Sequence, residues 1–215
     1  YRAQVGKILN LKKAEVLHNS RWLGRLKLKD FLNLLAKFSL KGAWQRADFQ
    51  KRLAAGKEVH LHEAMYHVLQ AYDSVAGKAD VELGSLDQKL NILAGRELQK
   101  KINGGWSQEA VLLPYLIGLD GKQKMSKSAG NTIDLRDSAD EMFGKTMSIP
   151  DGAIINYAEL AAWFPVEKVK RLARSLEKGE NPRDVKMKVA EGVAALYHGG
   201  AAAKKARQKF IDVFS

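Results

Sequence analysis

The residues best suited to chemistry form the string Lys124-Met125-Ser126-Lys127-Ser128, in a loop flanked by Gly121 and Gly130. Two lysines three positions apart can contact one phosphate chain from the same side, because each carries a compact, mobile charge. Serine hydroxyls and loop N–H groups add donors. Such a loop can stabilise charge that develops when pyrophosphate leaves. A solvated basic loop would have the same composition, so the order of the residues has to decide.

A second set of polar residues shares one face of an expected helix. Tyr66, Gln70 and Asp73 stand at positions i, i+4 and i+7, a spacing that aligns side chains on a helix. A carboxylate and an amide can accept hydrogen bonds from an ammonium group, and a carboxylate can also accept one from a phenol hydroxyl. A solvent-facing stripe that ends in an acid would show the same spacing.

The turn from Gly84 to Gln88 is a third candidate. A glycine before a helix lets a nucleotide approach the backbone closely. Asp87 is also a good helix N-cap, which is the structural alternative.

The pattern around these residues predicts an α/β region, residues 1–147, followed by an all-α region, residues 148–215. Ala110–Pro114 is a continuous apolar run, typical of a buried parallel strand. Asn181 before Pro182 is a good helix start. Strands are expected at Glu15–His18, Asp80–Gly84 and Ala110–Pro114. Helices are expected at Tyr1–Leu11, Leu26–Phe38, Phe49–Leu53, His62–Val75, Asp87–Ile102, Ala139–Met147, Ala153–Trp163, Glu167–Lys178, Arg183–His198 and Ala201–Phe214.

Composition narrows the function classes. A formal net charge of +12 favours a polyanionic partner, although solubility alone would also explain it. Cysteine is absent, which excludes disulfides and thiolate chemistry. His60 and His62 fall short of a zinc ligand set. The tryptophans are interpreted as core or interface residues rather than base-stacking platforms: Trp22, Trp44, Trp106 and Trp163.

The string Lys124–Ser128 matches the second signature motif of class I aminoacyl-tRNA synthetases, and its place before a helical region also fits that family. The wider chain resembles bacterial tyrosyl-tRNA synthetases. The resemblance is carried by Tyr1–Val5, Asn19-Ser20, Trp22-Leu23, Asp48-Phe49, Leu69–Ser74, Val81–Gly84, Asp87-Gln88, Gly95–Leu98 and Met142–Lys145. It implies the C-terminal part of a Rossmann-type catalytic domain, then a helical anticodon-binding domain.

The resemblance also implies a reaction: tyrosine and ATP, which carries Mg²⁺, give tyrosyl-adenylate and pyrophosphate, and the tyrosyl group then moves to tRNA(Tyr). Neither a protein-bound metal nor an organic cofactor is implied. Lys124 and Lys127 would stabilise the departing pyrophosphate. The implied ATP-binding set is Lys124, Met125, Ser126, Lys127, Ser128, Gly84 and Asp87. Tyr66 and Gln70 would contact the amino group of tyrosine and Asp73 its hydroxyl, and Gln88 completes the tyrosine-binding set.

This sequence departs from the family pattern in two respects. The turn reads Gly84-Ser85-Leu86-Asp87-Gln88, where the family normally has Gly-Gly-Thr/Ser-Asp-Gln. The first ATP motif, His-Ile-Gly-His or similar, does not occur in these residues. We therefore expect the 215 residues alone to be inactive in ATP–pyrophosphate exchange.

The family also implies a cytoplasmic homodimer, with an interface in the region of Leu26–Arg52. Two alternatives stay open at this point, a tryptophanyl-type synthetase and a non-catalytic tRNA-binding paralogue.

Overall fold

The computed structural model describes residues 2–39 and 47–214. Their contacts divide the chain into two compact units, one formed by Val16–Pro114 and the other by Tyr1–Glu15 together with Tyr115–Ser215. The fold class expected from the sequence, α/β followed by all-α, is confirmed. The division of contacts falls at Pro114, because the loop after the last strand packs with the C-terminal helices. The domain boundary near residue 148 remains a prediction. Trp44 lies outside the described residues.

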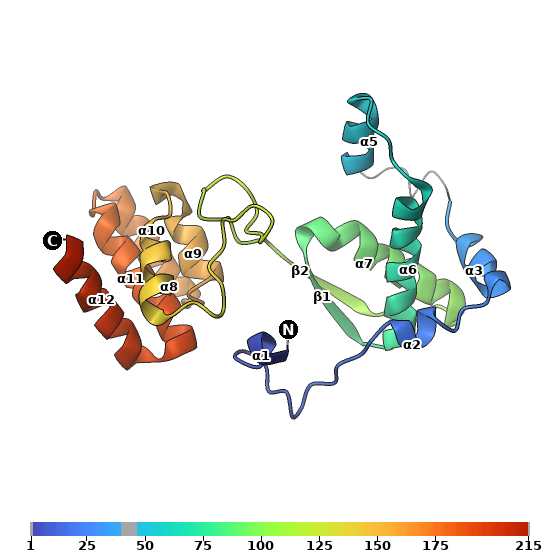
Figure 1. Cartoon of the computed structure of the whole chain (residues 1–215), viewed down its shortest axis with the longest axis horizontal. Helices are drawn as coiled ribbons and strands as arrows, with labels where there is room; N and C mark the ends of the chain where they lie inside the picture. Colours follow the sequence, from blue (N-terminus) through green and yellow to red (C-terminus); the bar gives the residue numbers. More distant parts are fainter. Residues whose placement is uncertain (1, 40–46, 215) are drawn as a thin grey trace. The chain divides into compact units, whose positions relative to one another are not determined.

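The unit Val16–Pro114 is built on two long helices and a small parallel sheet (Figure 1). Strands β1 and β2 pair in parallel, with Val81 opposite Glu109 and Ser85 opposite Leu113. Helix α7 makes the crossover between them, as parallel strands require, and it packs against both strands and against α6. Its elements are α2 (Ser20–Leu23), α3 (Leu28–Leu35), α5 (Ala47–Ala54), α6 (Leu61–Gly77), β1 (Val81–Ser85), a 3₁₀ turn (Leu86–Gln88), α7 (Lys89–Ile102) and β2 (Glu109–Leu113).

The two strands are parallel as expected, but the prediction that Ala110–Pro114 is buried is wrong. Successive strand side chains point to opposite faces. The parallel register puts Leu83 opposite Val111 on one face, and their side chains remain 69% and 42% exposed. Leu112 and Ala110 alternate with them and are half-buried. The apolar run therefore gives the strand apolar side chains on both faces of the sheet, and the face with Leu83 and Val111 stays largely exposed.

Helix α5 is tied to α6 by an ion pair. Arg52 donates from both terminal nitrogens to the Glu63 carboxylate, at 2.5 and 3.0 Å. The backbone N–H of His60 donates to the same carboxylate at 3.0 Å, at the start of α6. The hydrogen bond from Arg52, the larger cause, and that from the His60 N–H lower the pKa of Glu63 to about 2.

The N-terminal expectations hold only in part. Helix α1 spans Arg2–Val5 and stops before Gly6, a poor helix former, so it is shorter than the predicted Tyr1–Leu11. The predicted strand at Glu15–His18 is wrong: these residues have no regular structure. A strand needs a neighbour for its backbone groups, and no described strand pairs with this segment.

The C-terminal residues form a helical bundle around α11 (Pro182–His198), which packs against α8, α9, α10 and α12 (Figure 1). Val185, Val189 and Val193 recur every four residues along α11 and are buried. Asn181 caps this helix as predicted, with its side-chain oxygen accepting from the Arg183 N–H at 2.9 Å. The other elements are α8 (Ala139–Met147), a 3₁₀ turn (Asp151–Ala153), α9 (Ile154–Leu160), α10 (Val166–Glu177) and α12 (Gly200–Phe214).

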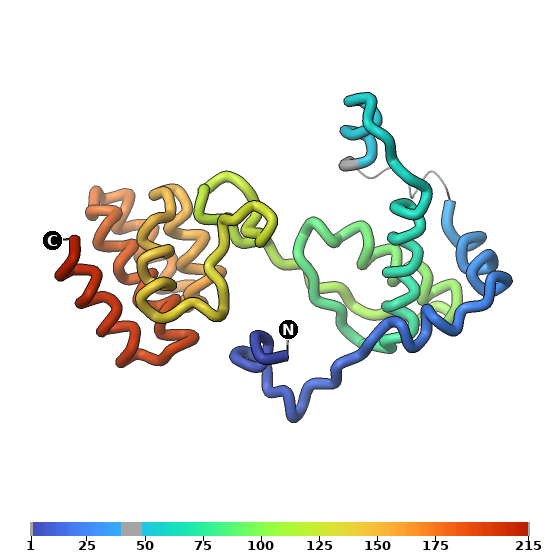
Figure 2. The backbone as a smooth tube through the Cα atoms, in the orientation of Figure 1, coloured from blue at the N-terminus to red at the C-terminus, as the bar shows by residue number. Residues whose placement is uncertain are grey.

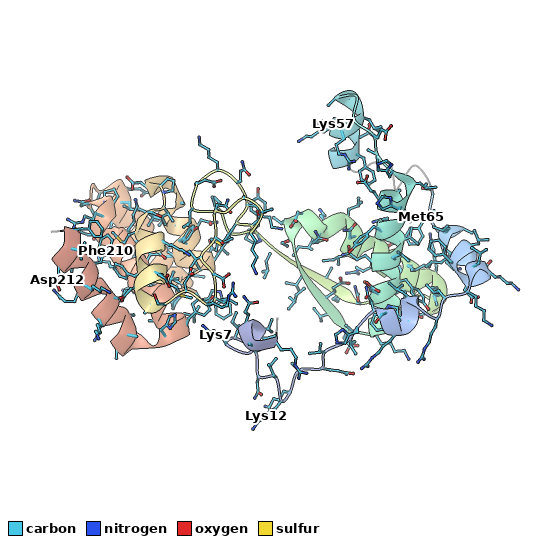
Figure 3. The ribbon with its side chains drawn as sticks, viewed as in Figure 1. Lys7, Lys12, Lys57, Met65, Phe210 and Asp212 are labelled. Atoms are coloured by element: carbon cyan, nitrogen blue, oxygen red, sulfur yellow. The ribbon has the colours of Figure 1, made fainter. Side chains whose placement is uncertain are left out.

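A second core cluster joins α8 to α12. Phe143 is fully buried, and its ring centroid lies 5.4 Å from that of Phe210. Phe210 of α12, labelled in Figure 3, packs in this cluster with Ala206 of the same helix and Met147 of α8. The helices predicted after Asp137 all form, with shifts of a few residues at their ends.

The interpretation of the tryptophans needs correction. Trp106 and Trp163 are exposed, so neither belongs to a core, whereas Trp22 is half-buried. Over the residues that the structure describes, no helix is long and apolar enough to cross a membrane. The same residues contain no cluster of three His, Asp or Glu side chains that could hold a metal ion.

Candidate active site

The signature loop begins with a short hairpin in the unit that contains the helical bundle. Ile117 pairs with Lys124 in an antiparallel bridge, and the Met125 N–H donates to the Leu116 carbonyl at 2.9 Å. At the tip, Asp120 accepts from the backbone N–H groups of Lys122 and Gln123, at 3.0 and 3.1 Å. These two bonds lower the pKa of Asp120, so the tip is held by an ionised carboxylate. Figure 2 traces this loop between β2 and α8.

The loop is anchored by Asn131, whose side chain is 5% exposed. Its amide oxygen accepts from the Ser126 N–H at 2.8 Å. Its amide nitrogen donates to Asp120 Oδ2 at 3.2 Å and to the Lys124 carbonyl at 3.3 Å. A Cβ at Gly118 would lie 2.0 Å from this nitrogen, so only glycine leaves room for it. Asn131 therefore holds the backbone of the signature string from inside; the residues flanking the string gave no sign of this role.

The signature side chains divide into inward and outward groups. Met125 is half-buried and packs against the bundle core formed around Tyr157 and Val189. Lys124 and Lys127 are exposed. Because Met125 and Asn131 fix the backbone, the two ammonium groups are presented on a supported loop, which is the arrangement that phosphate binding needs.

The serines of the signature string add hydroxyl groups beside the lysines. Ser126 Oγ lies 3.3 Å from Ser128 Oγ and accepts from the Ala129 N–H at 3.3 Å. The hydroxyls therefore lie on the same short turn as Lys127, where they can serve as phosphate donors.

The second candidate site lies in the unit Val16–Pro114, where the end of α6 meets β1. A cavity of ≈ 400 Å³ opens there, within the range typical of small-molecule sites. Gln70 and Asp73 line it as the helical spacing predicted, but Tyr66 is 67% exposed and lies outside it. Its lining residues are Gln70, Asp73, Ser74, Gly77, Ala79, Val81, Glu82, Leu83 and Gln108.

Asp73 is held in place by two donors that sequence reasoning missed. Trp22 Nε1 donates to Asp73 Oδ1 at 2.7 Å, and Asn19 Nδ2 donates to Oδ2 at 3.2 Å. Each carboxylate oxygen can accept further hydrogen bonds, so Asp73 keeps capacity for a hydroxyl or ammonium group. Asn19 and Trp22 belong to the segments that carry the family resemblance. This was the only feature of the sequence that pointed to a role for them.

Glu82 and Gln108 form a polar floor in the same cavity. Glu82 Oε2 accepts from Ser74 Oγ at 2.7 Å and also from Gln108 Nε2. The buried Gln99 accepts from the Gln108 N–H at 2.9 Å and donates to the Ser74 carbonyl at 2.9 Å. Because these buried amides are bonded, the floor is fixed before a ligand arrives. Glu82 was not singled out in the sequence.

A chain of amides links the cavity to the turn after β1. Gln70 Nε2 donates to Gln88 Oε1 at 3.4 Å, and Asn91 Nδ2 donates to the same oxygen at 3.1 Å. Asn91 in turn bonds the buried His67, at 2.9 Å. The structure thus brings together Gln70 and Gln88, both predicted to bind tyrosine.

The turn Gly84–Gln88 differs from expectation in detail. Gly84 lies in β1, and a Cβ there would lie 2.3 Å from Ile92 Cδ1, so a larger residue would require the end of the Ile92 side chain to move. The interpretation of Asp87 as the N-cap of the next helix is wrong, since it lies inside the 3₁₀ turn and Gln88 is the N-cap. Ser85 stands where the family normally has glycine. Its Oγ donates a hydrogen bond to Asp87 Oδ1, so this replacement adds a contact to the Asp87 carboxylate.

The comparisons with known proteins identify the class. Over residues 1–215 the chain matches the family described as tRNA synthetases class I (W and Y). The protein belongs to this family of class I aminoacyl-tRNA synthetases.

Among curated proteins, it is similar to tyrosine–tRNA ligase 2 of Vibrio parahaemolyticus, with 43% identity over 215 residues. It is also 45% identical over 214 residues to the tyrosine–tRNA ligase of Shewanella oneidensis. All of this chain is covered in both cases, but only 54% of each relative, so the chain spans about half their length.

Solved structures agree on the fold. The tyrosyl-tRNA synthetase of Archaeoglobus fulgidus, solved in complex with L-tyrosine, matches with a TM-score of 0.69 at 24% identity. The match covers 94% of this chain and 70% of that chain. A C-terminally truncated mitochondrial tyrosyl-tRNA synthetase of Aspergillus nidulans matches with a TM-score of 0.66 at 19% identity.

Proposed function

We propose that the protein is a tyrosine–tRNA ligase that activates tyrosine with ATP and transfers the tyrosyl group to tRNA(Tyr). The observation that carries the tyrosine assignment is the cavity beside α6, where Asp73 is fixed by Trp22 and Asn19. A half-buried carboxylate that is already oriented can accept from a phenol hydroxyl. When phenylalanine binds instead, the carboxylate lacks this donor, and that loss disfavours phenylalanine. Discrimination of this kind reaches roughly 10⁴–10⁵ without editing.

The proposed roles follow from the chemistry of each group. Asp73 accepts from the tyrosine hydroxyl, and Gln70 and Gln88 bind the rest of the amino acid. Tyr66, whose side chain lies outside the cavity, keeps the amino-group contact that the family resemblance implies. Gly84 and Asp87 bind the ribose of ATP. Lys124 and Lys127 stabilise the charge on pyrophosphate as it leaves, and Met125, Ser126 and Ser128 shape the loop around it. No covalent enzyme intermediate is needed, so positioning and electrostatics supply the catalysis.

Mg²⁺ would reach this site as a complex with ATP. It usually binds through substrate phosphates with few protein carboxylates. The ion would offset charge on the phosphates, while the chain itself contributes the lysines of the signature loop.

The proposed domain roles are those of the family: residues 1–147 belong to the catalytic domain, and residues 148–215 form a tRNA anticodon-binding domain. The second region is basic: after Phe164–Pro165 it contains twelve Lys and Arg against six Asp and Glu. This excess of positive charge supports an RNA partner. The cytoplasm is the expected compartment.

A homodimer is proposed through α3. Leu28 and Leu32 lie one turn apart on this helix and are 74% and 55% exposed, while Phe31, Leu34 and Leu35 pack inward. An apolar stripe on the outer side of an amphipathic helix is suited to contact a second subunit.

Tyrosine-dependent ATP–pyrophosphate exchange in the full-length protein tests the proposal. We expect exchange with tyrosine and, at equal concentration, at least about 10⁴-fold less with phenylalanine. Exchange with tryptophan instead of tyrosine would support the tryptophanyl-type alternative. No exchange with any amino acid, in a protein that still binds tRNA, would support the non-catalytic paralogue.

A further inference from the structure

Trp163 is exposed in an unfavourable backbone conformation. It follows α9 and has φ of +52°, in the left-handed region, and its side chain is 66% exposed. A bulky residue in this region is a conformational outlier, since helix ends of this kind usually carry glycine or asparagine. Outliers held by the surrounding structure concentrate at functional sites.

The turn itself is fixed by the next residue, Phe164. The Phe164 N–H donates to the Ala158 carbonyl at 3.0 Å. Its ring packs against α11 at Gly192, where an added Cβ would lie 2.4 Å from the ring. Lys168 Nζ lies 3.3 Å from the centroid of the same ring. Phe164 thus supplies the packing at this turn, whereas Trp163 combines a strained backbone with a largely exposed indole.

The helix that follows this indole is basic. Lys170, Arg171, Arg174 and Lys178 are exposed and recur at intervals of one, three or four residues, so they share one side of α10 and its end. Lys170 pairs with Glu167 at 3.1 Å on the surface, an interaction that salt and competing phosphates readily replace. Between Val166 and Lys178 there are five basic and two acidic residues.

We propose that Trp163 stacks on an unpaired base of a structured RNA, while the cations of α10 contact the flanking phosphates. This surface is called the Trp163 platform below. An exposed aromatic side chain beside a basic stripe is the combination by which proteins bind single-stranded nucleic acid, and single-stranded loops are where RNA bases become accessible. The inference rests on the proposed function, which supplies tRNA as the RNA partner, and it names Trp163 as the residue that stacks on that RNA.

Binding measurements on the full-length protein test the Trp163 platform. The probes are a fluorescein-labelled RNA hairpin with a seven-nucleotide loop, a blunt RNA duplex with the same stem, and a tRNA(Tyr) transcript. We expect Trp163→Gly to weaken hairpin and tRNA binding about five- to 100-fold and to leave duplex binding unchanged. Trp163→Phe should keep most of the affinity, because it keeps an aromatic face.

Two controls separate the platform from general effects. Trp106→Gly, at an exposed tryptophan of the other unit, should leave RNA binding unchanged. Replacing Arg171 and Arg174 by alanine should weaken hairpin and duplex binding alike and reduce the salt dependence of both. Trp163→Gly should unfold at the same temperature as the wild type or higher, since glycine fits the left-handed turn.

The outcomes are distinct. Wild-type hairpin affinity in Trp163→Gly overturns the proposal, as does an equal loss for hairpin and duplex. A change in oligomeric state with unchanged RNA binding would identify the platform as a protein interface and also overturn it. Tyrosine-dependent pyrophosphate exchange needs no RNA and should be unchanged in this variant. Its absence in the wild type would therefore contradict the ligase proposal and not the platform.

Discussion

The helical bundle and the α/β unit bury their apolar residues to very different degrees. In the bundle, Phe143, Tyr157, Val185 and Val189 are completely buried, and all five C-terminal helices contribute to closed clusters. In the unit Val16–Pro114, the sheet leaves Leu83 and Val111 on an open face. Within these 215 residues, which span about half the length of the curated relatives, the bundle supplies its own core, whereas the small sheet leaves one apolar face largely open.

The two candidate sites also differ in how their side chains are held in place. The signature loop is supported from within by Asn131 and Met125, and its reactive groups project from a closed core. The cavity at α6 and β1 is lined in part by polar side chains that are already hydrogen-bonded, among them Asp73 and Glu82. The first arrangement suits mobile charges that follow a leaving group, and the second suits a small ligand recognised by fixed partners.

The largest expected effect is on the bundle core. Phe143→Ala should lower the free energy of unfolding by about 3–5 kcal/mol, because it removes a fully buried ring and leaves a cavity. The matched change on the open sheet face, Leu83→Ala, should cost less than about 0.5 kcal/mol. Urea denaturation followed by circular dichroism measures both. Equal losses would mean that the sheet face is covered in solution, and the comparison would fail.

A smaller effect is expected at the anchor of the signature loop. Asn131→Ala removes three hydrogen bonds and leaves the Ser126 N–H without its acceptor, at a cost of about 1–3 kcal/mol. Since the loop backbone would loosen, the KM for ATP in pyrophosphate exchange should rise, with the KM for tyrosine unchanged. Gln123→Ala, in the same loop, keeps the backbone bond to Asp120 and serves as the control. If both KM values rise together in Asn131→Ala, the loop is not a separate phosphate element.

The smallest effect concerns the turn after β1. Ser85→Gly removes the hydroxyl that donates to Asp87 Oδ1 and therefore one competitor for a ribose hydroxyl at this oxygen. The KM for ATP should fall by about two- to tenfold, the value of one ordinary hydrogen bond. Ser85→Ala removes the hydroxyl but keeps the Cβ, so it separates the hydrogen bond from the space. An unchanged or higher KM in both variants would show that Asp87 does not bind the ribose.

Local pattern predicted most of the elements, because the information lay within each segment. Apolar spacing located α6, α7 and the C-terminal helices, and Asn181-Pro182 marked the start of α11. Burial of β2 was mispredicted because an apolar run does not report how many faces are covered. The strand expected at Glu15–His18 failed because pairing depends on a partner far along the chain.

The candidate site was predictable where a residue type has one use at a fixed spacing. The motif singled out the signature loop, whereas the family resemblance, and not the helical spacing, singled out Gln70 and Asp73; the roles of all these residues remain predictions. Asn19, Trp22 and Asn131 were missed, because their roles arise from contacts between distant segments or inside an irregular loop. Trp163 was interpreted as a core or interface residue; its exposure excludes the core, and the interface remains a prediction.

The central claim is that charge stabilisation and tyrosine recognition belong to different units and can be separated. Its most direct test is Lys127→Ala in the full-length protein, with Lys122→Ala as the matched loop control. We predict that Lys127→Ala lowers the kcat of tyrosine-dependent pyrophosphate exchange about 10²–10³-fold, while the Kd for tyrosine in equilibrium dialysis stays within about twofold of wild type. Wild-type exchange in this variant, or loss of tyrosine binding with it, would contradict the account.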